Sequence, residues 1–295
     1  MTASKINQTA VGTIPLPNTF ELNTHLKLLD AIVSLKNGII DQAEEHGMEG
    51  AQAWDHFCHE GAAKFLDWSE DIEISKKTIT VPPLDILMIW HSFMLNTNDY
   101  ARFDKQSMRG RLAGRGIDWN DLSFKLDSNY DEILDTLASW DESVKTPRSP
   151  TPRDLSAITD FDMVAAVQRQ LKFAEKMHDA QWRHKPTRDD FLESAVARYE
   201  EFFTLIAENP DVCLTPTLAI DLVCLYESYS RHMTNGRLVS HDDTVDESSL
   251  EQASLVTEKL YFEKYGVPYK PWIRGGRTDA AVAPGDPPSC SGSSD

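Results

Sequence analysis

The stretch PPLDILMIWH, from Pro82 to His91, carries the clearest prediction of local structure in the chain. Proline is tolerated in the first turn of a helix and pre-sets the backbone angle φ there, so Pro82 and Pro83 predict a helix start. The helix body continues as LDILMIWHSFML, and Asn96 is its predicted end. Because Asp85, Trp90 and His91 are chemically capable side chains, this segment is also the first candidate for a functional site.

Helical periodicity extends outward from this segment over most of the chain. From Phe20 to Ile39 apolar residues recur at steps of three and four, the spacing of one helix face. Trp54 to Leu66 repeats the pattern, whereas Ile72 to Val81 alternates loosely and predicts either a short strand or an extended loop. The prediction is an all-α fold with at most a minor β element, with further helices at 98–103, 129–144, 160–183, 188–208, from Pro216 onward and at 248–265.

Proline and glycine divide the predicted helices into two related halves that pack together. Lys145 to Asp154 (KTPRSPTPRD) holds three prolines in a polar run and is the clearest linker. The predicted organisation is an irregular N-terminal arm at 1–18, a first helical half with the Trp-His motif at 19–144, the Pro-rich linker at 145–155, a second helical half with a degenerate motif at 156–274, and a disordered tail at 275–295.

Composition narrows the classes of partner and compartment. The formal net charge of -18 repels phosphate backbones and anionic membranes, so neither nucleic acid nor a membrane surface is expected as a partner. Met1 to Pro17 lacks the charged start and apolar core of a signal peptide, and no run of about 18 apolar residues exists. Four scattered cysteines argue against a disulfide scaffold, so a cytoplasmic location is expected.

The two halves contain similar segments, which predicts an internal repeat. VPPLDILMIWH at 81–91 aligns without gaps with TPTLAIDLVCL at 215–225. In the second copy Asp85, Trp90 and His91 correspond to Ala219, Cys224 and Leu225. Any chemistry therefore belongs to the first copy.

These motifs resemble the glycine-rich domain-containing-protein-like family of fungi and plants. The resemblance rests on four stretches in order: PPLDILMIWHSFMLNTNDY at 82–100, PTLAIDLVCLYESY at 216–229, SHDDTVDE at 240–247 and EKYGVPY at 263–269. It implies a helical fold and no established activity. The family's second Trp-His-Thr-His is replaced here by CLYE at 224–227, and its cysteine-rich end is absent, which weakens a metal site built from paired Trp-His motifs. The resemblance also suggests an accessory role in a fungal small-molecule pathway, that is, in secondary-metabolite biosynthesis.

Asp85 and His91 are the predicted catalytic residues, with Trp90 beside them as a binding residue. Six positions along a helix turn the chain by about 240°, so Asp85 and His91 do not share a face. Asp85 is suited to cap its own helix start. His91 is either an acid, base or ligand in a cleft, or a buried histidine that holds a helix junction.

A basic, glycine-containing loop at 107–116 is the second candidate site. Arg109, Arg111 and Arg115 concentrate positive charge in an acidic chain, and a flexible loop of this kind binds a carboxylate or phosphate. The alternative is that these arginines pair with acidic neighbours.

Metal-binding patterns are present but incomplete. His56 and His59 lie at i and i+3 on a predicted helix, so both can reach one ion if the fold supplies a third ligand. Asp242, Asp243 and Asp246, with His241 beside them, match the aspartate-rich pattern that binds magnesium diphosphate in terpene cyclases. Neither pattern is complete, so no cofactor is predicted, although a divalent metal is compatible with both.

Two functions remain open from the sequence. In the first, a cleft between the halves binds an organic small molecule, and His91 with Asp85 or the basic loop orients or protonates it, as in a cofactor-independent tailoring enzyme or isomerase. In the second, the chain is a non-catalytic adaptor that binds other proteins. The enzyme requires His91 in a deep apolar pocket, whereas the adaptor requires a fully buried His91 with no cavity beside it.

Overall fold

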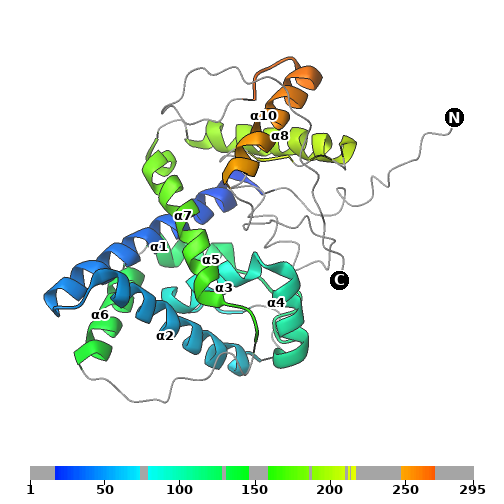
Figure 1. The fold of residues 1–295 in the computed structure, drawn as a ribbon. Helices are drawn as coiled ribbons and strands as arrows, with labels where there is room; N and C mark the ends of the chain where they lie inside the picture. Colours follow the sequence, from blue (N-terminus) through cyan, green and yellow to red (C-terminus); the bar gives the residue numbers. More distant parts are fainter. Residues whose placement is uncertain are drawn as a thin grey trace.

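The computed structural model describes residues 17–73, 79–127, 131–145, 159–185, 188–209, 212, 214–216 and 247–269. Throughout this part of the chain the regular structure is helical and no strand occurs, which confirms the all-α prediction (Figure 1). For Ile72 to Val81 the sequence predicted a short strand or an extended loop, and its described residues, 72–73 and 79–81, are irregular rather than a strand. The α-helices are α1 Thr19–Glu45, α2 Gly50–Asp71, α3 Leu84–Met94, α4 Thr97–Phe103, α5 Trp119–Asp127, α6 Asp131–Lys145, α7 Met163–Ala180, α8 Arg188–Glu208 and α10 Glu247–Tyr265.

Helix α3, which contains the opening motif, lies at the centre of the core. All eleven of its residues are buried. Helices α2, α4, α6 and α7 pack around it. A helix that is apolar on every side needs protein on every side, and this arrangement provides it. The Pro-Pro start and the apolar body of the motif therefore belong to the central helix of the fold.

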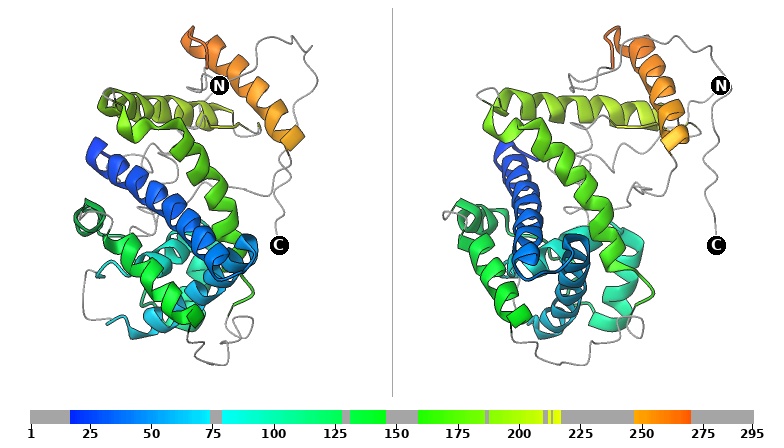
Figure 2. Two further views of the ribbon diagram at one scale, coloured as in Figure 1. Left: turned by 90° about the vertical axis from the view of Figure 1, so that its left-hand side faces the viewer. Right: turned by 60° about the vertical axis from the view of Figure 1, so that its left-hand side comes forward.

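Helix α1 is the longest element and runs along several others (Figure 2). Its first turn is a capping box, in which the side chain of Asn18 accepts from the Glu21 backbone N–H and the Glu21 carboxylate accepts from the Asn18 N–H. Its buried side contacts α2, α5, α6, α7 and α8. The core is thus built on two helices, α1 and α3.

Gly61 allows α2 to approach α3 closely. A Cβ atom added at Gly61 would lie 3.2 Å from the backbone carbonyl oxygen of Asp85 and 3.4 Å from the Ile89 side chain. Absence of a side chain therefore sets the separation of α2 from the motif helix at this crossing.

Several boundaries differ from those predicted. Helix α5 was not predicted at all, and α4 begins at Thr97 after Asn96 rather than with Asn98 as its cap. The basic loop is shorter than predicted because Asp104–Met108 continues α4 as a π-helical turn. The helix predicted to Arg183 ends at Ala180, since Gln181 takes a left-handed conformation with φ of 54° and a 3-10 turn, η4 at Trp182–His184, follows.

Helix α7 lies beyond the predicted linker yet packs against α1, α2 and α3 of the first half. Helices α8 and α10 cross at the end of the molecule away from α2 and α6 (Figure 1). Tyr265 joins them by donating from its hydroxyl to the Glu201 carbonyl over 2.9 Å, and Tyr261 bonds the Glu201 carboxylate. The arm at 1–16, the linker from residue 146, the Pro216 helix beyond its first residue, the acidic cluster at 242–246 and the tail at 275–295 lie outside the described residues.

None of the helices in the described ranges combines the length and the apolar character needed to cross a bilayer.

Candidate functional site

His91 forms a hydrogen-bonded pair with His25, a pairing that was not predicted from the sequence. His25 on α1 and His91 on α3 place their Nε2 atoms 3.1 Å apart, so that one ring donates and the other accepts. Both side chains have no exposed surface. The Trp119 ring, at the start of α5, packs against the His25 ring in an edge-to-face arrangement with 5.7 Å between centroids. Three elements far apart in sequence thus enclose the pair.

Burial keeps both imidazoles neutral. It lowers the pKa of His25 to about 3, and burial together with the neighbouring His25 lowers the pKa of His91 well below its ordinary value. Neither the pocket beside Trp68 nor the one beside Lys27 is lined by His25 or His91. A buried, neutral imidazole that bonds a second imidazole is suited to joining α1 to α3.

Asp85 faces other neighbours than His91, in agreement with their spacing on the helix. Its carboxylate accepts from the Ile86 backbone N–H over 2.9 Å and from Lys64 Nζ on α2 over 2.7 Å. Glu132 on α6 accepts from the Leu84 N–H, and burial raises the pKa of Glu132. Two carboxylates therefore serve the first turn of α3, where backbone N–H groups need partners.

Trp90 is enclosed by aromatic side chains. Its indole Nε1 donates to the Tyr100 hydroxyl over 2.9 Å, and its ring lies 5.0 Å from that of Trp68 on α2. The indole has no exposed surface. Asp85 and Trp90 thus both contact α2, whereas His91 contacts α1, and the functional roles predicted for all three stay predictions.

The basic loop is folded around a buried carboxylate. Asp104 accepts from the Leu112 backbone N–H over 2.8 Å and from that of Ala113. Burial raises the pKa of Asp104, although both N–H groups and the Arg115 charge act in the opposite direction. Arg109 is exposed at the turn with a left-handed φ of 56°, whereas Arg111 is half-buried.

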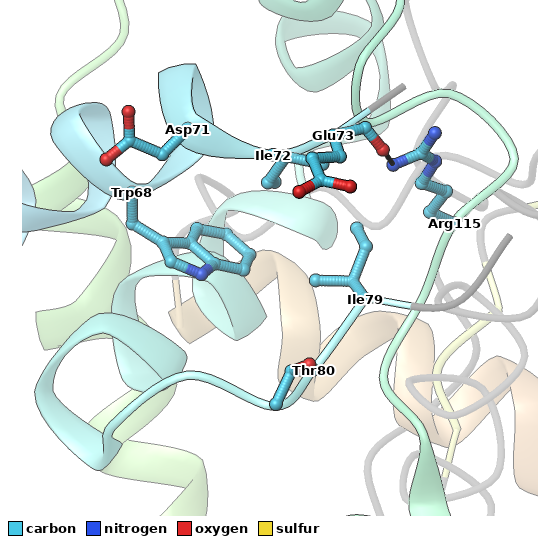
Figure 3. Close-up of a pocket in the computed structure, with 7 residues that line it drawn as sticks. All are labelled: Trp68, Asp71, Ile72, Glu73, Ile79, Thr80 and Arg115. Carbon is cyan, nitrogen blue, oxygen red and sulfur yellow. Dashed lines mark hydrogen bonds between the residues drawn. The ribbon is translucent and has the colours of Figure 1, made fainter. Parts of the chain in front are cut away.

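Arg115 turns inward from this loop and lines a pocket (Figure 3). Its Nη1 donates to the Glu73 carbonyl oxygen over 3.0 Å, and only 9% of the residue is exposed. The pocket has a volume of about 170 Å³ and is lined by Trp68, Asp71, Ile72, Glu73, Ile79, Thr80 and Arg115. Arg115 is therefore buried at this pocket, whereas Arg109 of the same loop is exposed to solvent.

A second pocket, beside Lys27 and Arg183, has a volume of about 10 Å³, which is room for one water molecule.

The histidines predicted as weak metal ligands lie on the outer face of α2. His56 packs 5.5 Å from the Trp140 ring, and His59 lies 3.6 Å from Asp55. In the described ranges no three His, Cys, Asp or Glu side chains gather closely enough to hold an ion. His241, Asp242 and Asp243 lie outside those ranges.

One polar cluster was missed by the sequence analysis. Asp30 on α1 accepts from His178 on α7 over 2.5 Å and from Arg183 over 2.7 Å. Asp30 is only 9% exposed and stands among the leucines and valine of the α1 core face. The position of Asp30 within an apolar helix face could have predicted this cluster, because a buried carboxylate requires a partner.

The described structure thus defines an all-α protein in which the motif helix is buried at the centre. Residues 120–234 match the profile of a family described as "Glycine-rich domain-containing protein-like". Glycine-rich domain-containing protein 1 of Arabidopsis thaliana is 29% identical over 251 residues, which are 74% of this chain and 29% of the relative. Glycine-rich domain-containing protein 2 of the same plant is 30% identical over 191 residues, 57% of this chain and 23% of the relative.

The resemblance that the order of the motifs indicated is confirmed, because the family profile matches residues 120–234 and both curated relatives are glycine-rich domain-containing proteins. The chain spans less than a third of the length of these two curated relatives. No solved structure matches it. The family profile covers the second copy of the predicted repeat but not Pro82 to His91, so the repeat stays a prediction.

Proposed function

We propose that the chain is a non-catalytic helical module that binds another protein. The observation that carries this proposal is the position of His91, which has no exposed surface and bonds His25 inside the core. A general acid or base must reach the proton that it transfers. A sealed, neutral imidazole does not meet that condition, but it does hold two central helices together.

The outer surface of α5 and α6 is the best candidate for the contact. Phe124 on α5 is 75% exposed and Leu134 on α6 is 59% exposed, the two largest exposures among the large apolar side chains of the described residues. The two helices pack against each other. Large apolar side chains on such a surface are typical of anchors that enter a partner's pockets.

Charge indicates the kind of partner. Asp135 and Glu142 are exposed on α6, and the whole chain carries a formal charge of -18. Complementary charge accelerates association and excludes partners of like charge. The occupant we propose is therefore a protein surface with apolar pockets and a basic rim.

Site-specific cross-linking tests this surface. A photoreactive benzophenone amino acid at position 124 should cross-link a defined protein in host cells. The same group at position 20, where Phe20 is 45% exposed on the first turn of α1, serves as the control. With the purified partner, the double variant Phe124→Ser/Leu134→Ser should bind at least about tenfold more weakly, because each buried anchor contributes more than about 1 kcal/mol.

Two further variants serve as controls for the proposed surface and for the role of His91 in binding. Phe20→Ser and His91→Gln, the latter compared at equal folded fraction, should leave partner affinity unchanged. Equal cross-linking at positions 20 and 124, with full affinity in the double variant, would refute the proposed surface.

The tailoring enzyme or isomerase of secondary metabolism stays a prediction with less support. It requires His91 at a pocket, whereas His91 has no exposed surface and the pocket of about 170 Å³ is lined by Arg115 instead. The magnesium-dependent alternative rests on Asp242, Asp243 and Asp246, which lie outside those residues. The cytoplasmic location likewise remains an expectation.

A further inference from the structure

The turn that continues α4 concentrates positive charge in an acidic protein. From residue 105 to residue 117 the sequence contains four cationic residues and no acidic one, whereas the whole chain has a formal charge of -18. Lys105 and Arg109 are exposed and Arg111 is half-buried, and these three residues are called the basic turn. At physiological salt their charge acts over about 8 Å, so a ligand at the turn responds mainly to these groups.

The side chains of the basic turn are not neutralised by the described part of the chain. There, no hydrogen bond or ion pair involves the side chain of Lys105, Arg109 or Arg111. Arg102, one turn earlier on α4, is by contrast bound to Asp99 over 2.5 Å. The sequence left open whether the loop arginines bind a ligand or pair with acidic neighbours. Because Arg109 and Arg111 have no acidic partner in the described ranges, the first alternative is favoured for both.

The backbone of the basic turn is held in a defined shape. Arg109 and Gly110 take left-handed φ values of 56° and 79°. The Gly110 N–H donates to the Asp104 carbonyl oxygen and the Arg111 N–H donates to that of Met108, each over 3.1 Å. Because these N–H groups are occupied, a ligand is recognised by the cationic side chains. A preorganised turn also reduces the entropy that is lost when a ligand binds.

We propose that the basic turn binds the phosphate group of a phosphorylated serine or threonine in a partner protein. A phosphomonoester carries about -1.5 to -2 charges at pH 7 and three acceptor oxygens. This matches two arginines and a lysine, because a guanidinium fork binds two phosphate oxygens at once. A membrane, a nucleic acid or a long acidic segment would also extend over the surrounding surface of a chain with a formal charge of -18.

A phosphopeptide titration tests the proposal on the unmodified chain. The probe is a neutral pentapeptide with one central phosphothreonine, acetylated and amidated at its ends, and matched peptides carry threonine or glutamate instead. The phosphopeptide should shift the backbone amide NMR signals of the basic turn most strongly, with a dissociation constant below about 1 mM. Both matched peptides should bind at least about tenfold more weakly, because neither carries a dianion. No binding at about 10 mM phosphopeptide, or equal affinity for the glutamate peptide, would overturn the proposal.

Vesicles distinguish a phosphoprotein from a membrane as the source of the phosphate. Phosphatidic acid presents the same phosphomonoester on a lipid surface, so vesicles of phosphatidylcholine and phosphatidic acid are the comparison. The chain should not sediment with these vesicles, because its net charge opposes an extended anionic surface. Sedimentation with the vesicles in the absence of phosphopeptide binding would assign the basic turn to a membrane and overturn the proposal.

Variants assign the binding to the basic turn. Arg109→Gln and Arg111→Gln should each weaken phosphopeptide binding at least about fivefold, and the double variant should not bind it at about 10 mM. The matched controls Lys172→Gln and Lys259→Gln each remove one exposed cation from another helix and should bind as the unmodified protein does. Equal losses in the controls would mean that net charge governs binding, which would contradict the assignment. This site shares no residue with the proposed surface on α5 and α6, so the two are tested separately.

Discussion

At the scale of single residues, the hydrogen bond between Trp90 and Tyr100 shows how the motif contributes to the core. The indole N–H donates to a hydroxyl that is itself buried, and burial raises the pKa of the Tyr100 hydroxyl. Tyr100→Phe keeps the ring but leaves the Trp90 N–H without its acceptor. We expect a loss of about 1–3 kcal/mol in the free energy of unfolding, measured by urea denaturation.

A double-mutant cycle isolates this bond from the packing of the two rings. In a Trp90→Phe background the donor is already gone, so Tyr100→Phe should cost clearly less than it does alone. Equal costs in both backgrounds would mean that the hydrogen bond contributes nothing measurable.

Residue roles were the least predictable part from sequence. The spacing of Asp85 and His91 indicated that they face apart, because helix rotation depends on sequence separation alone. The partner of His91 was not predictable, since His25 lies 66 positions away and only the tertiary fold brings it near. Arg115 was recognised as cationic, but its inward direction depends on the buried Asp104 that organises the loop.

At the scale of helices, α1 is joined to α7 and to the turn η4 after it by polar contacts of different burial. Asp30 binds His178 and Arg183 with a side chain only 11% exposed. The bond from Lys36 to Glu175 joins side chains that are 24% and 41% exposed. Asp30→Ala should cost about 2 kcal/mol in unfolding free energy, and Lys36→Ala less than about 1 kcal/mol, because solvent competes for the second pair.

The salt dependence of the unfolding free energy distinguishes Asp30→Ala from Lys36→Ala further. In about 1 M sodium chloride the cost of Lys36→Ala should shrink toward zero, whereas most of the Asp30→Ala cost should remain, since screening acts mainly on exposed charges. Equal costs for the two variants at low salt would contradict the assignment of Asp30 as the stronger connection.

Most helices were predictable because their buried faces recur at the helical period. The prediction for α8 at 188–208 matched its bounds. Helix α5 was missed because its nine residues contain only a short apolar pattern, with Phe124 exposed and Leu122 buried. Helix α7 ends where Gln181 adopts a left-handed conformation. Glycine and asparagine are the usual residues in that conformation, so a glutamine gave no signal for the helix end.

At the scale of the whole molecule, the core does not stop at the predicted linker. Proline-rich composition predicted a linker at 145–155, and residues 146–158 lie outside the described part, so the linker stays a prediction. It did not indicate that α7 would return to pack on α1 and α3. Linker composition reports local chain properties, whereas the extent of a core depends on which apolar faces meet.

The buried histidine pair makes stability of the whole fold depend on pH. Burial lowers the pKa of His25 to about 3 and that of His91 well below its ordinary value, whereas in the unfolded chain both titrate near about 6.5. Above that pH both are neutral in either state and contribute no pH dependence. Below it the unfolded chain takes up protons that the folded chain refuses, so the free energy of unfolding falls as pH falls.

Two such histidines give a slope of about 2.7 kcal/mol per pH unit between about pH 6 and pH 4.5, before carboxylates add their own contributions. Urea denaturation at half-unit steps of pH measures it. His91→Gln should remove about half of that slope, and His59→Gln, which changes an exposed histidine on α2, should leave it intact. If the unmodified protein has an unchanged free energy of unfolding from pH 6.5 to pH 5, the pair is not sealed from water. In that case His91 would be accessible to protons, and the argument for a purely structural role would lose its basis.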